Sequence, residues 1–284
     1  MIAGMTLIAH ISDLHLLEDD HHERRGASWL RLQYLTFGKP RSPATRRLRV
    51  RKLLDQALRA HADHLVITGD LTEDGSIGQF ESLAQVLFES GWSPSRVTLV
   101  PGNHDLYSHP GAWRAALDGP LSRYAPTSEE GAVISLPDVT IVPLSTAFHQ
   151  PILRAAGALS RRALEALDDW ASWRSRDWSA IVVAQHHPPR SYAVAPLRWI
   201  DGLEGHDHLL RIMARHEHLH LLHGHTHSSR SKPVRDGGTH RIFSVDSAQS
   251  DGEALRLYRA RYRRLFAEPV RVETMEPISL AVPV

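Results

Sequence analysis

Val100-Pro101-Gly102-Asn103-His104-Asp105 is the stretch that best indicates the fold of this 284-residue chain. It follows an apolar run at residues 97–100, which predicts a buried strand, and Pro101-Gly102 ends that strand in a sharp turn. Three polar side chains are thus placed at the carboxyl end of a strand, where open α/β sheets bind ligands. An Asn carbonyl can bind a divalent metal, a His can move protons near neutral pH, and the Asp after it can orient that His. A helix N-cap in a polar turn is the plainer interpretation of the same residues.

Polar side chains recur after four further predicted strands, the short apolar runs that lead up to them in the chain. Side chains two residues apart share a face of extended backbone, so D-x-H and H-x-H pairs can bind one ion from the same side. Because such strand ends converge on one edge of an α/β sheet, we expect these side chains to lie together. The strands are residues 6–11, 64–68, 180–185 and 219–222, and the polar residues are Asp13 with His15, Asp70, His186 with His187, and His225 with His227.

The composition limits the class of protein and the kind of metal site. The chain contains 42% hydrophobic residues, enough for a sizeable core, and its net charge of +1 does not suggest a polyelectrolyte binder. It has no Cys and 20 His, so a metal site would use His, Asp, Glu or Asn. We see neither a run of 18 apolar residues nor a signal peptide, so we expect a soluble cytoplasmic protein.

The segment from about residue 24 to 52 differs from the rest of the chain. It carries ten Lys or Arg and no Asp or Glu, interleaved with Trp29, Leu30, Leu32, Tyr34, Leu35 and Phe37. One interpretation is a solvated loop that leads into a basic helix. Another is an amphipathic lid that meets an anionic surface, either a phospholipid leaflet or a charged substrate. Nucleic-acid binding is less favoured, because no recognisable nucleic-acid module surrounds the segment.

The remaining pattern predicts alternating helices and strands in one domain, residues 1–284, with the basic, aromatic segment as an insertion. Residues 118–131 are loop-like, and residues 132–136 and 139–144 predict a hairpin. After residue 227 the chain becomes rich in predicted strands, at 233–235, 241–245, 254–262 and 270–274. The predicted helices lie at about 45–60, 76–90, 111–117, 160–173 and 203–216.

The order of the motifs D-x-H, G-D, G-N-H-D, H and G-H-x-H closely resembles that of the calcineurin-like metallophosphoesterase superfamily, over residues 13–227. The resemblance implies an α/β fold, a four-layer αββα sandwich of two mixed β-sheets flanked by helices. It also implies two divalent metal ions, for which these N and O donors favour Mn, Fe, Zn or Co over calcium. The family often has Asp or Asn where this chain has Glu73.

The resemblance also assigns roles to the polar residues. His104 would be the catalytic histidine, acting as general acid or electrostatic stabiliser, and Asp105 its partner. We take His187, Tyr107 and His149 as candidate substrate-binding residues. Asp13, His15 and His227 would hold one metal, Asn103, His186 and His225 the other, and Asp70 would bridge the two.

The motifs G-N-H-D, H-H-P-P and G-H-T-H look most like those of bacterial phosphodiesterases, which include cyclic-nucleotide and glycerophosphodiester enzymes. We therefore expect hydrolysis of a phosphodiester bond by a metal-activated water or hydroxide. A UDP-2,3-diacylglucosamine pyrophosphate hydrolase, which would contact the inner membrane surface peripherally through residues 24–52, is a second possibility. The motifs are also compatible with a phosphomonoesterase and with a non-catalytic metal-binding scaffold. Neither the oligomeric state nor the physiological substrate follows from the sequence.

Overall fold

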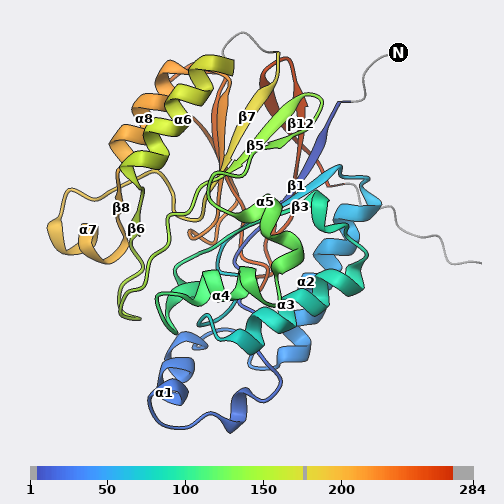
Figure 1. Cartoon of the computed structure of the whole chain (residues 1–284), viewed down its shortest axis with the longest axis vertical. Coiled ribbons are helices and arrows are strands. Elements are labelled where there is room, and N and C mark those ends of the chain that lie inside the picture. The colour runs from blue at the N-terminus through green and yellow to red at the C-terminus, as the bar shows by residue number, and fades with distance from the viewer. Residues whose placement is uncertain (1–4, 175–177, 271–284) are drawn as a thin grey trace, which may run out of the picture.

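Two β-sheets lie face to face in the middle of the molecule, and helices cover the outer face of each (Figure 1). The structure is a computed structural model, and it describes residues 5–174 and 178–270. Apolar side chains of both sheets meet in one core layer, for example Ile8 and Val66 from the first sheet with Val182 and Leu222 from the second. The predicted four-layer αββα sandwich is therefore confirmed.

The first sheet has five strands in the order β13-β12-β1-β2-β3. β1 and β2 are parallel, as are β2 and β3, whereas β12 runs antiparallel to β1. The carboxyl ends of the three parallel strands β1, β2 and β3 thus lie at one edge. The strands are β1 (Leu7–Ile11), β2 (His64–Thr68), β3 (Val97–Val100), β12 (Arg256–Arg261) and β13 (Arg264–Glu268).

The second sheet has six strands in the order β10-β11-β9-β7-β5-β4. Its four central strands are parallel to one another, and each of the two edge strands runs antiparallel to the strand beside it. The predicted hairpin is present as β4 and β5. The strands are β4 (Ile134–Ser135), β5 (Val139–Pro143), β7 (Ala180–Ala184), β9 (Leu219–His223), β10 (Arg230–Pro233) and β11 (Arg241–Ser244).

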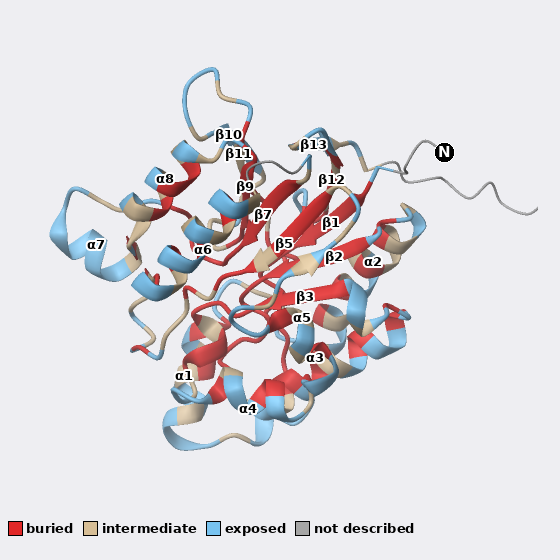
Figure 2. Cartoon of the chain, turned by 45° about the horizontal axis from the view of Figure 1, so that its top comes forward, coloured by how far each residue is buried: buried red, intermediate tan, exposed pale blue. Residues whose placement is uncertain are grey.

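The outer helix layers bury one apolar face each, as Figure 2 shows by colour. Three helices pack on the first sheet, namely α2 (Pro43–Arg59), α3 (Ile77–Ser90) and α4 (Ala112–Asp118). Two pack on the second sheet, namely α6 (Arg161–Trp173) and α8 (His206–Arg215). In α6 the Ser160 side chain accepts a hydrogen bond from Ala163 N, which caps the helix. No helix in the described ranges has the length and apolarity that a membrane span requires.

Several elements differ from the sequence-based prediction. The helix expected from 203 starts at His206, because residues 203–204 form β8 (Leu203–Glu204) with β6 (Gly157–Ala158), and Gly205 is left-handed. The strand expected over 254–262 ends at Arg261, where Tyr262 and Arg263 adopt left-handed turn conformations. The loop at 118–131 contains α5 (Ala125–Ser128), and α7 (Ala195–Asp201) was not predicted. Of the strand expected at 270–274, residues 271–274 lie outside the described residues.

The basic segment at 24–52 divides into two parts with different surroundings. Its second part belongs to α2, which is packed in the core, whereas its first part forms α1 (Gly26–Leu35) at the lower end of the molecule in Figure 1. Trp29, Leu30, Tyr34 and Phe37 are exposed, but Leu32 and Leu35 are buried. The expectation that all six apolar residues belong to an exposed lid is therefore wrong for these two leucines.

The positive charge of this segment is also smaller than its composition suggests. Seven of its ten cations have carboxylate partners that come from other parts of the chain. The segment is therefore less positively charged at the surface than the absence of Asp and Glu within it implies. The seven are Arg24 and Arg31 with Asp74, Lys39 and Arg46 with Glu73, Arg47 with Asp19, Arg49 with Asp251, and Arg51 with Glu89.

Candidate metal centre

The polar residues after the strands converge on one edge of the two sheets. Eight non-glycine residues of the described chain have left-handed backbone conformations, and five of them are Asp13, His15, Asp70, His225 and His227. Such conformations are strained for L-residues and persist where the surrounding structure enforces them, most often at functional sites. The concentration of strain on five predicted ligands marks this edge as the candidate site.

The first cluster joins the end of β1 to the loop after β9. Asp13, His15 and His227 offer ligand atoms that all lie within 4.8 Å of one another. Asp13 Oδ1 is 3.1 Å from His227 Nε2, and the His15 and His227 rings are 5.7 Å apart. The structure thus brings together the three residues that the resemblance assigned to one metal.

The second cluster joins the ends of β3, β7 and β9 around the His186 ring. Asn103 Oδ1 and His225 Nδ1 each lie 3.2 Å from His186 Nε2. His186 Nδ1 donates to the Thr68 carbonyl at 2.8 Å, so Nε2 is the nitrogen that faces the site and that would bind a cation once it has lost its proton. These are the three residues assigned to the other metal.

Asp70 lies between the two clusters. Its Oδ1 is 3.4 Å from His186 Nε2, and its Oδ2 is 3.9 Å from His15 Nε2. The backbone approaches closely here: a Cβ on Gly102 would lie 2.2 Å from Asp70 Oδ1, so only glycine fits that position. One carboxylate with an oxygen toward each cluster can bridge two cations.

His104 is oriented by a different group from the one predicted. Its Nδ1 lies 2.6 Å from the Glu73 carbonyl, which can only accept, so this nitrogen is the donor. Asp105 instead accepts hydrogen bonds from Gly102 N, Leu71 N, and Thr72 N and Oγ1. The expectation that Asp105 holds the His104 ring is therefore wrong; Asp105 fixes the loops that carry Asp70 and His104.

The three candidate substrate-binding residues occupy unequal positions. The Tyr107 hydroxyl accepts a hydrogen bond from Asn103 Nδ2 at 2.8 Å, so this buried residue orients a predicted ligand. His187 is buried, with Nδ1 2.7 Å from Thr146 Oγ1, and its ring centre is 4.8 Å from that of His225. Only His149 is exposed, with Nδ1 2.7 Å from the Leu106 carbonyl.

Residues that the sequence analysis missed support the clusters from outside. Asp201 Oδ1, at the end of α7, is 2.5 Å from His225 Nε2 and accepts a hydrogen bond from it, which leaves Nδ1 of His225 facing His186. On the other side, Lys39 Nζ is 2.6 Å from Glu73 Oε1 and 3.3 Å from His15 Nδ1. No motif in the sequence links these residues to the ligands.

Burial and charge set the protonation of the ligands in the metal-free protein. Burial lowers the pKa of His15 well below its ordinary value, and the Lys39 cation lowers it further. Burial opposes the charge of His186, but Asp70 outweighs it and raises the pKa of His186 to about 9. The pKa of Asp70 lies well below its usual range despite burial, because His186 and His104 stabilise the carboxylate. An ionised carboxylate and a neutral His15 are the forms that bind cations.

The donor set fits divalent cations. His15 Nε2 is buried and has no hydrogen-bond partner within the described residues, although it faces Asp70. A buried nitrogen without a partner is costly unless another species takes its lone pair. Imidazole nitrogens with carboxylate and amide oxygens suit Mn, Fe, Zn or Co.

Comparison with known proteins agrees with this geometry. A family model described as calcineurin-like phosphoesterase matches residues 6–229. A Synechococcus protein named probable cyclic nucleotide phosphodiesterase is 31% identical over 231 residues, which cover 80% of this chain and 75% of that protein.

Two solved structures show the same fold at low sequence identity. A dimetal phosphatase from Danio rerio superposes with a TM-score of 0.66 and 14% identity, over 92% of this chain and 98% of its own. A purple acid phosphatase from yellow lupin (Lupinus luteus) seeds has a TM-score of 0.55 and 13% identity, over 92% of this chain and 50% of its own.

Proposed function

The chain belongs to the calcineurin-like phosphoesterase family, and we propose that it is a phosphodiesterase that depends on two divalent metal ions. The position of Asp70 carries this proposal, because its two oxygens face the His186 side and the His15 side of the site. In the proposed arrangement Asp13, His15 and His227 hold one ion, Asn103, His186 and His225 hold the other, and Asp70 is shared.

The ions would supply an activated water and would neutralise charge on the phosphoryl oxygens. The protein's own residues hold the site in shape. Asp201 keeps the Nε2 proton on His225, and Tyr107 keeps the Asn103 carbonyl oxygen toward the site. Both contacts are already made in the protein alone, so little rearrangement is needed on binding.

His104 is proposed to donate a proton to the leaving oxygen of the substrate. Because Nδ1 stays bonded to the Glu73 carbonyl, Nε2 is the nitrogen that exchanges a proton with the substrate. The cationic ring would donate from Nε2 and return to the neutral form with the Nδ1 bond intact. Burial lowers the pKa of His104 below its ordinary value, and the Lys39 cation adds to this, although Asp70 and the Glu73 carboxylate partly oppose it.

A diester is favoured over a monoester by the relative named probable cyclic nucleotide phosphodiesterase. A membrane-surface hydrolase of a lipid-linked pyrophosphate is the second candidate. Exposed apolar side chains in and just after α1 favour it, namely Trp29, Leu30, Tyr34 and Phe37. The ion pairs that neutralise most cations of residues 24–52 weaken the electrostatic attraction expected between this segment and an anionic membrane.

Turnover of bis(p-nitrophenyl) phosphate against p-nitrophenyl phosphate, with Mn added, tests the proposal. A phosphodiesterase should prefer the diester, and removal of metal should abolish turnover. Preference for the monoester would support a phosphomonoesterase, and no turnover of either would support a scaffold. Cyclic nucleotides and UDP-2,3-diacylglucosamine would then distinguish the two diester-type candidates.

A further inference from the structure

A pocket of about 470 Å³ opens beside the metal centre and shares His225 and Asp201 with it. One wall is the irregular loop Pro188-Pro189-Arg190, and the other is formed by the edge strand β10 and its neighbour β11. The pocket is therefore next to the place where the scissile phosphate would bind, and His225 is the one member of its lining that belongs to the predicted ligand set.

Two cationic residues of β10 line this pocket, as expected from the register of the strand. Arg230 pairs with Ser244 and Lys232 with Ile242, and these four residues line the pocket. Side chains alternate along a strand, so Arg230 and Lys232 lie on one face of β10. The Arg256 guanidinium donates to the Arg230 carbonyl at 2.6 Å and to the Ser244 carbonyl at 3.0 Å, which holds the two strands together.

The charges in the pocket are unbalanced. None of the ion pairs within residues 5–174 and 178–270 includes Arg230 or Lys232. Asp201 is the acidic residue of the lining, and it already accepts from His225 and Tyr192 and lies 3.4 Å from Arg190. Both walls of the pocket thus carry cationic side chains. The lining as a whole has more positive than negative charge.

We propose that this pocket binds a second phosphate group of the substrate, separate from the phosphodiester that is cleaved. A simple diester carries one negative charge, which the metal centre already meets. A phosphate monoester group carries about two charges and accepts several charge-assisted hydrogen bonds, which Arg and Lys donate well. The inference rests on the proposed function, since it concerns the same substrate.

A matched pair of ligands tests the pocket by binding alone. Thymidine 5′-monophosphate and thymidine 3′,5′-bisphosphate differ only in the second phosphate, and calorimetry with the Mn-loaded protein gives both affinities. We expect the bisphosphate to bind at least roughly tenfold more tightly. Replacement of both β10 cations, R230Q with K232Q, should abolish most of that difference.

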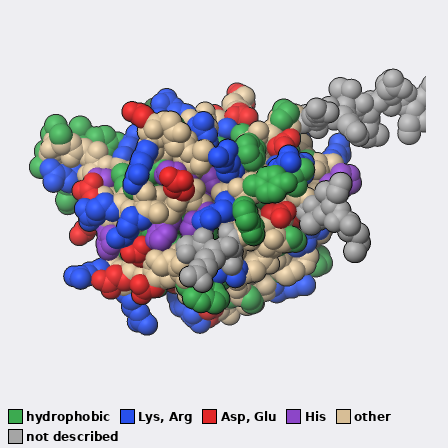
Figure 3. All heavy atoms as spheres, turned by 90° about the horizontal axis from the view of Figure 1, so that it is seen from above, with side chains coloured by type: hydrophobic (Ala, Val, Ile, Leu, Met, Phe, Trp, Pro, Cys, Tyr) green, Lys and Arg blue, Asp and Glu red, His purple; other side chains and the backbone are tan. Residues whose placement is uncertain are grey.

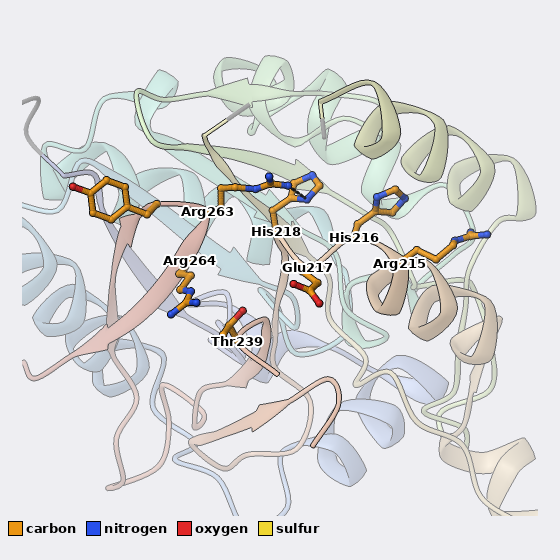
Figure 4. Close-up of a pocket in the computed structure, with 8 residues that line it drawn as sticks. Arg215, His216, Glu217, His218, Thr239, Arg263 and Arg264 are labelled. Carbon is orange, nitrogen blue, oxygen red and sulfur yellow. Dashed lines mark hydrogen bonds between the residues drawn. The ribbon is translucent and has the colours of Figure 1, made fainter. Parts of the chain in front are cut away.

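The control variant removes the same charge from the opposite edge of the sheets. A hollow of about 380 Å³ lies there, lined by Arg263 and Arg264 among others, on a face where Lys, Arg and His side chains are common (Figures 3 and 4). Arg261 and Arg264 are exposed on the β12–β13 hairpin, so R261Q with R264Q changes net charge equally. This variant should keep the preference for the bisphosphate.

Two results would overturn the inference. Equal affinities of the wild-type protein for the two ligands would mean that β10 carries Lys and Arg only to protect a sheet edge. An equal loss of preference in both double variants would mean a general effect of net charge. Turnover of the p-nitrophenyl ester of thymidine 5′-monophosphate, measured beside binding, reports on the proposed function: no turnover with intact preference would contradict only the function.

Discussion

The Tyr107 hydroxyl accepts a hydrogen bond from Asn103 Nδ2 at 2.8 Å and donates one to the Arg154 carbonyl at 2.9 Å. This pair of contacts fixes which atom of the Asn103 amide faces His186. We therefore predict that Tyr107→Phe weakens one metal site by roughly 10–100-fold, as is typical when the partner of a ligand is lost. Metal titration of the variant should show one weakened and one unchanged affinity. Two unchanged affinities would assign Tyr107 to another role.

His104→Ala should retain both metals and lower kcat by roughly 10²–10⁴-fold if the ring donates a proton. Because p-nitrophenolate needs no proton to leave, the loss should be smaller for aryl esters than for alkyl diesters. Steady-state kinetics on both substrates, with metal content measured in parallel, gives the comparison. Equal losses for both leaving groups would argue against proton donation.

Replacing Trp29, Leu30 and Phe37 with Ser tests the exposed apolar side chains in and just after α1. These side chains are exposed, so the triple variant should fold normally and turn over small aryl diesters almost as well as wild type. If α1 contacts lipid, the variant should lose co-sedimentation with anionic vesicles at low salt. Leu32→Ser is the matched comparison: because Leu32 is buried, this substitution should instead lower the stability of the protein. Wild-type protein that binds no vesicles at low salt would exclude the membrane-surface candidate.

We predict that the protein loses stability in mild acid because two of its histidines are buried. Burial lowers the pKa of His64 and of His220 to about 4, with nearby Arg96 adding to the effect at His64. The unfolded chain takes up these protons near pH 6.5 and the folded protein only near pH 4. The contribution of these two histidines to stability is therefore complete above about pH 6.5 and falls towards pH 4, by about 1.4 kcal/mol per pH unit for each histidine.

Urea unfolding of the metal-free protein between pH 7.5 and 4.5 measures this slope. His64→Gln can keep the contact that His64 Nε2 makes with Thr98 Oγ1 at 2.9 Å, but it does not titrate. The variant should show a shallower loss of stability than wild type over this range. Identical slopes would mean that His64 is protonated in the folded protein.

The central strands and the residues after them could be predicted from sequence, because buried parallel strands are short apolar runs that end in polar turns. The side chains of the predicted ligands come together as expected. Asp13, His15 and Asp70 adopt left-handed backbone conformations where they enter the clusters. Their roles as metal ligands stay predictions. The family resemblance supplied the pairing of ligands, which spacing alone did not give.

The supporting contacts could not be predicted, since they join distant segments through single side chains. Glu73 meets Lys39 and the fully buried Arg46, and Asp201 reaches His225 from a helix that the sequence analysis did not identify. Adjacency in sequence also misled: Asp105 follows His104, yet the turn sends its carboxylate to the backbone of Leu71 and Thr72. Charge within residues 24–52 was overestimated for the same reason, because its partners lie elsewhere in the chain.

The metal content of Asp70→Ala tests the central claim most directly. Asp70 faces both clusters, so its loss should lower occupancy at both sites and leave less than one metal per protein, where we expect the wild type to hold two. Elemental analysis after equilibration with Mn, with circular dichroism to show that the variant folds, gives the answer. Full occupancy of both sites in folded Asp70→Ala would contradict the shared-carboxylate centre.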